Sequence, residues 1–155
     1  MKFIYTDIDG VLALGNEYNR KITKWGYIYR FNKKAVKVYN EILETCDAWP
    51  VISSDWRILY SLEQLQEIFI EWAGICREPV SVTPHFKEAT LQRLEEFRAK
   101  EILEHVEKYK PEAWVAIDDL DMKKWLGDEH FVLLPRWMEG IKQSGKKKKI
   151  IERLT

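Results

Sequence analysis

The sequence predicts an α/β fold in which five parallel strands form one sheet with helices on both faces. Five short apolar runs, at residues 2–6, 49–53, 79–83, 113–117 and 130–134, alternate with segments of helical periodicity. Strands that alternate with helices along a chain usually form a parallel sheet covered on both sides. Acidic or hydroxyl-bearing residues follow several of these runs, and ligand sites of such sheets lie beyond the carboxyl ends of the strands.

Length and composition indicate one globular domain over residues 1–155. Hydrophobic residues make up 46% of the chain and charged residues 32%, and the formal net charge is zero. No apolar run reaches the roughly 20 residues that span a bilayer, and acids soon interrupt the N-terminal run, so we expect a cytoplasmic protein without a membrane segment or signal peptide. Cys46 and Cys76 lack the spacing of a zinc or redox site.

Two of the expected helices show clear amphipathic patterns. Residues 33–45 and 61–73 carry apolar side chains at helical spacing, and Ser61-Leu62-Glu63-Gln64 is a capping-box pattern. A third helix is expected at 100–109, ended by Pro111. The lysine run at 146–149 is interpreted as a solvated helix face.

Two segments fit the alternating plan less well. Residues 13–31 are aromatic and β-prone after Gly15-Asn16, so we expect a loop or small hairpin inserted after the first strand. Residues 84–97 are polar and charged, are compatible with a helix, and suggest no function.

Carboxylates follow two of the predicted strands. Asp7 and Asp9 come after the first strand, Asp118 and Asp119 come after the fourth, and Ser53 ends the second. Carboxylates gathered at one edge repel each other unless a cation lies between them or their pKa values rise. Because the donor set contains only oxygen, Mg²⁺ is the cofactor that fits it.

Two simpler interpretations of Asp7-Ile8-Asp9-Gly10 are weaker. A calcium-binding EF-hand loop would require glycine at its sixth position and glutamate at its twelfth, where this chain has Leu12 and Tyr18. An ordinary Asp-Gly turn would explain this stretch alone. It would not explain the second acidic pair in WVAIDD.

The ordered set resembles the haloacid dehalogenase (HAD) superfamily of aspartyl-nucleophile phosphatases. YTDIDGVL resembles the first motif, VISS the second, the basic residue of FRAKEI the third and AIDD the fourth. The resemblance implies a Rossmann-like fold and, with only the 13–31 insert available as a lid, a minimal cap or none. SSDWR, RAKEI and IDDLDM followed by HFVLL are similar to HAD-type domains of nucleic-acid repair proteins and polynucleotide kinase/phosphatases, although Asp55 departs from their usual Ser-Ser-Trp-Arg run.

The resemblance implies roles for the first motif. Asp7 would be the phosphoryl acceptor and a metal ligand. Asp9 would act as general acid and base through its carboxyl and bind the metal through its backbone carbonyl. Gly10 would let backbone N–H groups approach the phosphate.

The other motifs supply the remaining candidate residues. Ser53 would donate its hydroxyl to the phosphate, and Ser54, Trp56 and Arg57 are candidate substrate contacts. The cation of the third motif is either Arg98, which alignment on Glu-Ile favours, or Lys100, because lysine is usual in the superfamily. Asp119 would bind the metal, with Asp118 as a further ligand or bonded to metal-bound water. Asp121 is interpreted as a helix cap, and His85, His105 and His130 have no metal spacing.

The leading hypothesis is therefore a Mg²⁺-dependent phosphomonoester hydrolase with an aspartyl-phosphate intermediate. An open site would admit a phosphate on a larger molecule, and Trp25, Tyr27, Tyr29 and Trp56 would stack bases if the substrate is a nucleic acid or nucleotide. The alternative is a noncatalytic module that keeps the fold and binds nucleic acid or protein. A phosphotransferase with an acceptor other than water also stays open, and the sequence does not determine the oligomeric state.

Overall fold

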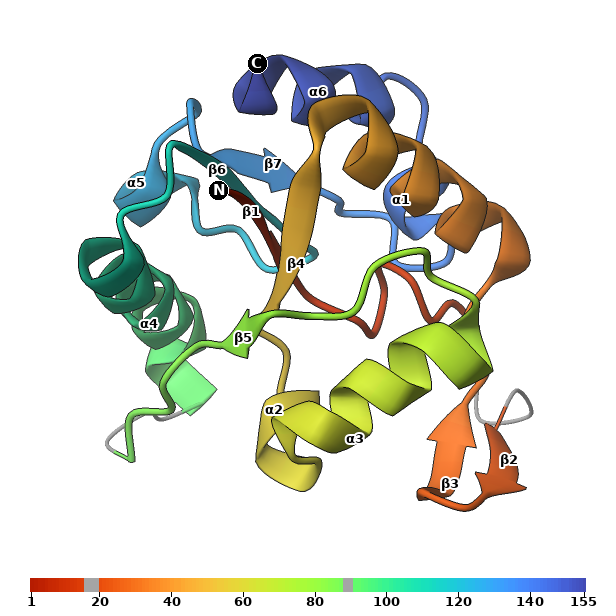
Figure 1. Ribbon diagram of the computed structural model, residues 1–155. Coiled ribbons are helices and arrows are strands. Elements are labelled where there is room, and N and C mark those ends of the chain that lie inside the picture. Colours follow the sequence, from red (N-terminus) through yellow and green to blue (C-terminus); the bar gives the residue numbers. More distant parts are fainter. Residues whose placement is uncertain (16–19, 88–90) are drawn as a thin grey trace.

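The computed structural model describes residues 1–15, 20–87 and 91–155, and its centre is a five-stranded parallel sheet (Figure 1). The strand order is β5 (Ser81–Val82), β4 (Ala48–Ile52), β1 (Lys2–Thr6), β6 (Ala113–Asp118) and β7 (Phe131–Leu133). The chain starts at the central strand and builds outward first on one side and then on the other. Crossovers therefore diverge around β1, where a ligand site is expected in such a sheet.

The register of the three central strands determines what meets at the carboxyl edge. Thr6 of β1 is paired with Ile52 of β4 and with Ile117 of β6. The next residues of the three strands, Asp7, Ser53 and Asp118, consequently lie at the same level of the sheet. Backbone bonds hold this level, because the Asp7 N–H donates to the Ile117 carbonyl at 3.2 Å and the Ser53 N–H donates to the Thr6 carbonyl at 3.2 Å.

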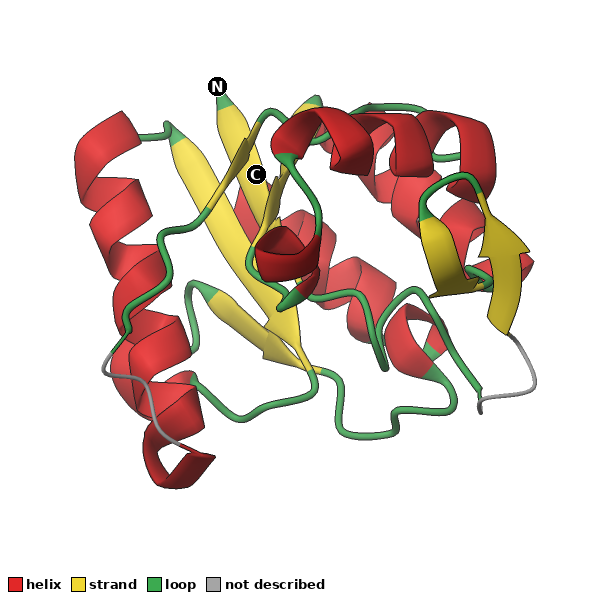
Figure 2. Cartoon of the chain, turned by 90° about the horizontal axis from the view of Figure 1, so that it is seen from below, coloured by secondary structure: helices red, strands yellow, loops and turns green. Residues whose placement is uncertain are grey.

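Helices cover both faces of the sheet (Figure 2). On one face lie α1 (Lys33–Cys46) and α6 (Lys146–Leu154), and on the other lie α4 (Leu94–Tyr109) and α5 (Lys123–Leu126). The chain after β4 forms α2 (Trp56–Leu59) and α3 (Leu62–Glu67), which continues as a π-helical segment, η2 (Ile68–Ala73). Two short 3₁₀ helices, η3 (Leu91–Arg93) and η4 (Gly140–Lys142), complete the fold. None of the helices among the described residues has the length and apolar character needed to cross a membrane.

Side chains alternate along the strands and so form two apolar cores. Ile4, Ile52 and Ile117 pack toward α1 and α6, whereas Phe3 and Tyr5 pack with Trp114, Ala99 and Ile102 toward α4. Alternation of this kind, with apolar residues on both faces, is what a sheet covered on both sides requires. The predicted α/β fold is thus confirmed.

Several predicted boundaries differ from the structure. The third strand keeps only two residues, and α4 begins at Leu94 instead of residue 100. The start of α4 is hard to see in sequence because the preceding Arg93 makes no side-chain capping bond, although Glu95 and Glu96 favour a helix N-terminus. The predicted 84–97 segment thus contains the start of α4, and its residues 88–90 lie outside the described ones.

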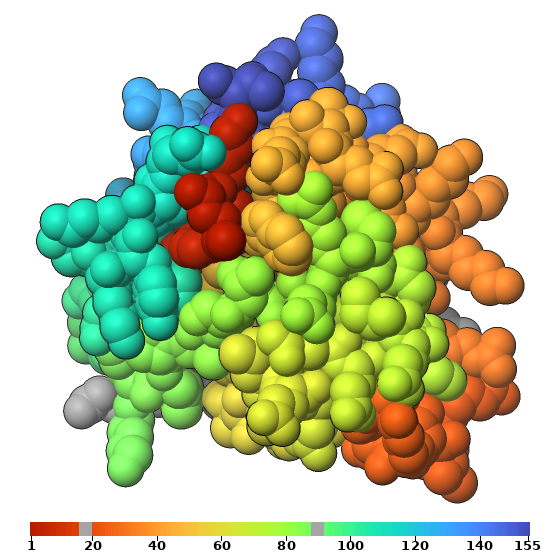
Figure 3. Space-filling model, in the orientation of Figure 1, coloured from red at the N-terminus to blue at the C-terminus, as the bar shows by residue number. Residues whose placement is uncertain are grey.

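The insert predicted at 13–31 contains an antiparallel hairpin of β2 (Arg20–Thr23) and β3 (Gly26–Tyr29), while its residues 16–19 lie outside the described ones. The hairpin packs beside the α3 and η2 segment (Figure 3). The Trp25 indole N–H donates to Glu67 at 3.0 Å, and the Trp72 indole N–H donates to the Tyr29 carbonyl at 3.0 Å. These bonds fasten the hairpin to neighbouring helices.

A buried histidine in the second core gives stability a pH dependence. The His105 ring bonds the Tyr5 hydroxyl through Nδ1 and Ser81 Oγ through Nε2, both at 2.8 Å, and burial lowers the pKa of His105 to about 4, with a smaller contribution from Lys108. Below about pH 6.5 the unfolded chain takes up a proton that the folded chain does not. The free energy of unfolding therefore decreases through His105 as pH falls from about 6.5 toward 4.

We expect the stability advantage of the wild type over His105→Gln, measured by urea unfolding, to shrink by about 2 kcal/mol between pH 7 and pH 5. Glutamine keeps hydrogen-bonding groups but does not titrate. The comparison with the variant is needed because the buried carboxylates at the sheet edge titrate with the opposite sign in part of this range. A difference between the two proteins that is the same at both pH values would contradict a neutral buried His105.

Candidate active site

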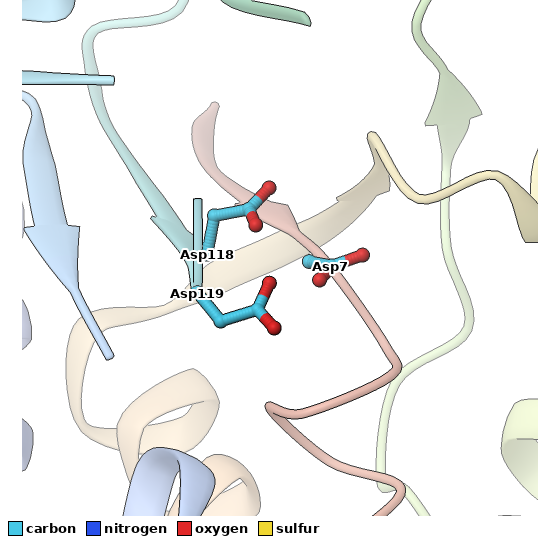
Figure 4. Close-up of side chains that lie close together, drawn as sticks. All are labelled: Asp7, Asp118 and Asp119. Atoms are coloured by element: carbon cyan, nitrogen blue, oxygen red, sulfur yellow. The ribbon is translucent and has the colours of Figure 1, made fainter. Parts of the chain in front are cut away.

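Three carboxylates meet where β1 and β6 end. One carboxylate oxygen from each of Asp7, Asp118 and Asp119 lies within 4.8 Å of the others (Figure 4). Asp7 and Asp118 are buried, while Asp119 is partly exposed. These three side chains offer only oxygen donors. The group therefore fits Mg²⁺ better than a softer metal.

Burial and mutual repulsion disfavour the ionised forms of the buried carboxylates in this cluster. Burial raises the pKa of Asp7 well above its usual range, and the nearby Asp118 carboxylate adds to this effect. Burial also raises the pKa of Asp118, which Arg98 partly offsets. Carboxylates in this position favour a bound cation, because the cation would remove the repulsion that raises their pKa values.

Arg98 is the cation that the structure brings to the cluster. Its Nη1 donates to Asp118 Oδ2 at 3.1 Å and lies 3.6 Å from Asp7 Oδ1, while its Nη2 donates to Asp55 Oδ1 at 3.1 Å. Burial opposes its charge, but the carboxylates of Asp118, Asp7 and Asp55 outweigh burial and raise the pKa of Arg98. Asp55, which interrupts the expected Ser-Ser-Trp-Arg run, thus holds the outer end of the guanidinium.

Lys100 does not reach the cluster. It lies two residues along α4, on another side of the helix, and its half-exposed ammonium pairs with Glu96 at 3.2 Å. Of the two alternatives for the third-motif cation, the structure brings Arg98 to the cluster and leaves Lys100 away from it.

Ser53 and Ser54 differ in what their hydroxyls do. Ser53 Oγ is buried and has no hydrogen-bond partner among the described residues, which is unusual for a buried hydroxyl. Ser54 Oγ accepts from the Trp56 N–H at 3.2 Å and so stabilises the start of α2. Ser53 is thus available to an incoming acceptor, whereas Ser54, a predicted substrate contact, is engaged within the protein.

Asp9 lies outside the three-carboxylate group and is exposed. Its Oδ2 accepts from the Trp56 indole N–H at 3.1 Å. Desolvation by the surrounding protein raises the pKa of Asp9, the Trp56 hydrogen bond opposes the rise, and the Asp119 carboxylate adds to it. A raised pKa favours the protonated form of the carboxyl, which is the form that a general acid needs.

Gly10 forms a turn beside the carboxylates, and its predicted role of letting backbone N–H groups approach the phosphate stays a prediction. Its N–H donates to the Ala13 carbonyl at 3.0 Å, so this N–H is engaged and does not face a ligand. Its φ is +80°, and a Cβ built there would lie 2.8 Å from Asp119 Oδ2 and 3.2 Å from the Cβ of Trp137. Glycine is required because the loop passes very close to Asp119.

Trp56 and Arg57, two predicted substrate contacts, are buried within the protein. Trp56 is 5% exposed and packs edge-on against Phe31, with Tyr60 beside it, so its ring has no open face for a base. Arg57 bonds Glu101 at 2.9 Å and four backbone carbonyls, which leaves its guanidinium in a structural role. The structure thus places both residues in intramolecular contacts, and their contact with substrate stays a prediction.

A cavity of about 310 Å³ opens beside the carboxylates. Asp9, Gly10, Tyr29, Asp119 and Trp137 are among its lining residues. Of the predicted aromatic residues, only Tyr29 lines it. Trp137, whose side chain is half exposed, was missed by the sequence reasoning, although its position just after the fifth strand, beyond Pro135-Arg136, was the available signal.

Comparison with known families agrees with this geometry. The family model for a HAD domain in Swiss Army Knife RNA repair proteins matches residues 3–144, which include all four motif positions. Neither a curated protein nor a solved structure matches the chain. The resemblance to HAD-type domains of nucleic-acid repair proteins is thereby confirmed.

Removing the unpartnered hydroxyl should affect catalysis and leave stability unchanged. We expect Ser53→Ala to lower kcat/KM for phosphate release about 10- to 100-fold, because a hydrogen bond to a charged group is worth roughly 1.5–3 kcal/mol. The free energy of unfolding should change little, since Ser53 Oγ bonds nothing in the described structure. Steady-state kinetics and urea unfolding measure the two quantities.

Ser54→Ala is the matched control. It removes the acceptor for the Trp56 N–H and should cost about 1 kcal/mol of stability. If Ser53→Ala lowered stability and left kcat/KM unchanged, the Ser53 hydroxyl would have no role in phosphate binding.

Proposed function

The chain belongs to the family of HAD domains in Swiss Army Knife RNA repair proteins, and from this premise we propose that it is a Mg²⁺-dependent phosphomonoesterase that forms an aspartyl-phosphate on Asp7. The observation that carries the proposal is the meeting of three carboxylates, Arg98 and the unpartnered Ser53 hydroxyl at one sheet edge. Carboxylates alone would suggest only a cation site. A buried cation and a free buried hydroxyl beside them are what a phosphoryl group needs.

In the first step an Asp7 oxygen attacks phosphorus in line with the leaving oxygen. The bond from Asp7 to phosphorus forms as the bond to the leaving oxygen breaks, and Asp9 gives that oxygen a proton. Arg98, 3.6 Å from Asp7, offsets charge on the nucleophile and on the transferred group. The Ser53 hydroxyl donates to a phosphate oxygen.

In the second step water attacks the same phosphorus and releases inorganic phosphate. Asp9, now ionised, takes a proton from this water, and Asp7 leaves as a carboxylate, so the residues return to their starting state. The raised pKa of Asp9 suits the first transfer, because it favours the protonated form that gives the leaving oxygen its proton.

Asp7 and Asp119 would hold Mg²⁺, with the Asp9 carbonyl as a further ligand and Asp118 supporting the group, and the ion would neutralise charge on the phosphate oxygens. The fit rests on an all-oxygen donor set and on the mutual repulsion that raises the pKa of Asp7. The chain itself then has to orient the phosphate and move protons.

The substrate we propose is a phosphate on a nucleic acid or nucleotide. The hairpin of β2 and β3 is bonded to α3 and η2, and the cavity beside Asp119 stays open at its lining residues Tyr29 and Trp137. An open site of this kind accepts a phosphate attached to a larger molecule. The RNA repair context of the family supports the same class.

The test is phosphate release from p-nitrophenyl phosphate and from 3′- and 5′-phosphorylated oligonucleotides, with Mg²⁺ and with EDTA. Release that needs Mg²⁺ and prefers one oligonucleotide end would support the proposal. Folded protein that binds oligonucleotides with a steep salt dependence but releases no phosphate would contradict it and favour a binding module.

A further inference from the structure

A second cavity, of about 450 Å³, carries four basic side chains. Arg30 follows β3, Lys33 and Lys34 form the first turn of α1, and Lys142 ends η4. Leu14 and Phe31 form its apolar wall. The chain has no net charge, so this concentration of cations is a local feature and not a property of the whole surface.

This basic cavity adjoins the candidate active site. Tyr29 lines the active-site cavity, and the next residue, Arg30, lines the basic cavity. In the same way, Gly15 lines the active-site cavity and its neighbour Leu14 lines the basic cavity. Consecutive Cα atoms lie about 3.8 Å apart, so neighbouring residues of the chain line the two cavities at both places. The Ile141 N–H donates to the Val11 carbonyl at 3.1 Å, which fixes the η4 segment carrying Lys142 against the loop that follows Asp9.

The four cations have no acidic partners in the part of the chain that the structure describes. Among residues 1–15, 20–87 and 91–155, no ion pair joins Arg30, Lys33, Lys34 or Lys142 to a carboxylate. The first turn of α1 holds two lysines and no acid, although the positive end of a helix favours acidic residues. Lysines at this position slightly destabilise the fold, which is expected where residues serve binding.

We propose that the basic cavity binds the phosphodiester backbone of a single nucleic-acid strand whose terminal phosphate lies at Asp7. This inference rests on the proposed function and extends it with a second, noncatalytic anion site. Trp137, 50% exposed and lining the active-site cavity, offers a ring on which a base near the strand end stacks. A nucleotide without further phosphates reaches the first site only.

The experiment compares two triple variants with equal loss of charge. Lys33→Gln/Lys34→Gln/Lys142→Gln removes three of the four cations of the basic cavity and leaves Arg30. Lys108→Gln/Lys123→Gln/Lys124→Gln removes three lysines from α4 and α5 on the other face of the sheet. Binding of a fluorescent single-stranded RNA carrying a terminal phosphate is measured by anisotropy between about 50 and 200 mM salt. Phosphate release is measured in parallel on the same RNA and on p-nitrophenyl phosphate.

For the basic-cavity variant we expect about tenfold weaker RNA binding and a salt slope smaller by about 2, because each phosphate contact on a single strand contributes about 0.7. kcat/KM should fall for RNA and stay unchanged for p-nitrophenyl phosphate. The α4 and α5 variant should behave as the wild type. Thermal unfolding should show no loss of stability in the basic-cavity variant, since two of the three lysines lie at the positive end of α1.

The outcomes separate this inference from the proposed function. Unchanged RNA binding in the basic-cavity variant, or an equal loss in both variants, would overturn the backbone site even if the protein is a phosphatase. Absence of phosphate release from every substrate, together with RNA binding that is lost only in the basic-cavity variant, would overturn the proposed function and leave the backbone site supported.

Discussion

Asp7→Asn should abolish phosphate release and stabilise the folded protein at the same time. Asparagine has nearly the same shape as aspartate but cannot accept a phosphoryl group, and loss of a nucleophile lowers kcat by about 10⁴-fold or more. Burial and the nearby Asp118 raise the pKa of Asp7, so the ionised group is unfavourable in the fold. A group with a raised folded pKa loses stabilising free energy as pH rises, and the neutral replacement avoids that loss.

The two effects are measured on one preparation. Phosphate release is followed with Mg²⁺, and thermal unfolding is followed in EDTA at about pH 7.5, where we expect a Tm higher by about 3 °C or more. Asp121→Asn is the matched control, because Asp121 is exposed and its carboxylate only accepts from the Lys123 N–H at 3.0 Å. Turnover retained by Asp7→Asn would show that another group receives the phosphate.

Arg98→Met should cost about 3 kcal/mol of stability at about pH 8, because it leaves buried carboxylates without their cation. The cost should be smaller at pH 5. Without Arg98, which lowers the pKa values of Asp7 and Asp118, both values rise further, so a larger share of the two carboxyls is protonated at pH 5 than at pH 8. A raised folded pKa means that stability is lost as pH increases through it.

Urea unfolding in EDTA at pH 5 and pH 8 measures this dependence. Lys100→Met is the control on the same helix, and its exposed pair with Glu96 should be worth less than about 1 kcal/mol at either pH. Phosphate release should be lost in Arg98→Met and kept in Lys100→Met. The reverse pattern would make Lys100 the third-motif cation.

The sheet and the meeting of its motifs were predictable because they depend on short-range patterns. Apolar runs that alternate with amphipathic helices determine the sheet, and parallel pairing then brings Asp7, Ser53 and Asp118 to one level. For the cation of the third motif, the sequence left two candidates, Arg98 and Lys100. To choose between them, one must know which side of α4 faces the carboxylates. The sequence did not show where α4 starts, because Arg93 provides no side-chain cap.

The side-chain partners were not predictable, because they depend on contacts between distant segments. Arg57 looked like a substrate ligand, but Glu101 of α4 and carbonyls near Thr83 take up its donors. In the sequence, Trp56 was a candidate for stacking on a base, but in the structure Phe31 of the insert packs against its ring. Trp137 and Lys142 reach their cavities only because the chain after β7 folds back against the loop beyond Asp9.

Trapping the covalent intermediate is the decisive test of whether Asp7 is the phosphoryl acceptor. The protein is mixed with an oligonucleotide whose terminal phosphate is radiolabelled, quenched in acid within a single turnover and digested for peptide mapping. The proposed mechanism predicts label on the peptide that contains Asp7, released by hydroxylamine as expected for an acyl phosphate and absent from Asp7→Asn. Rapid release of labelled phosphate with no label on the protein at any quench time would contradict it.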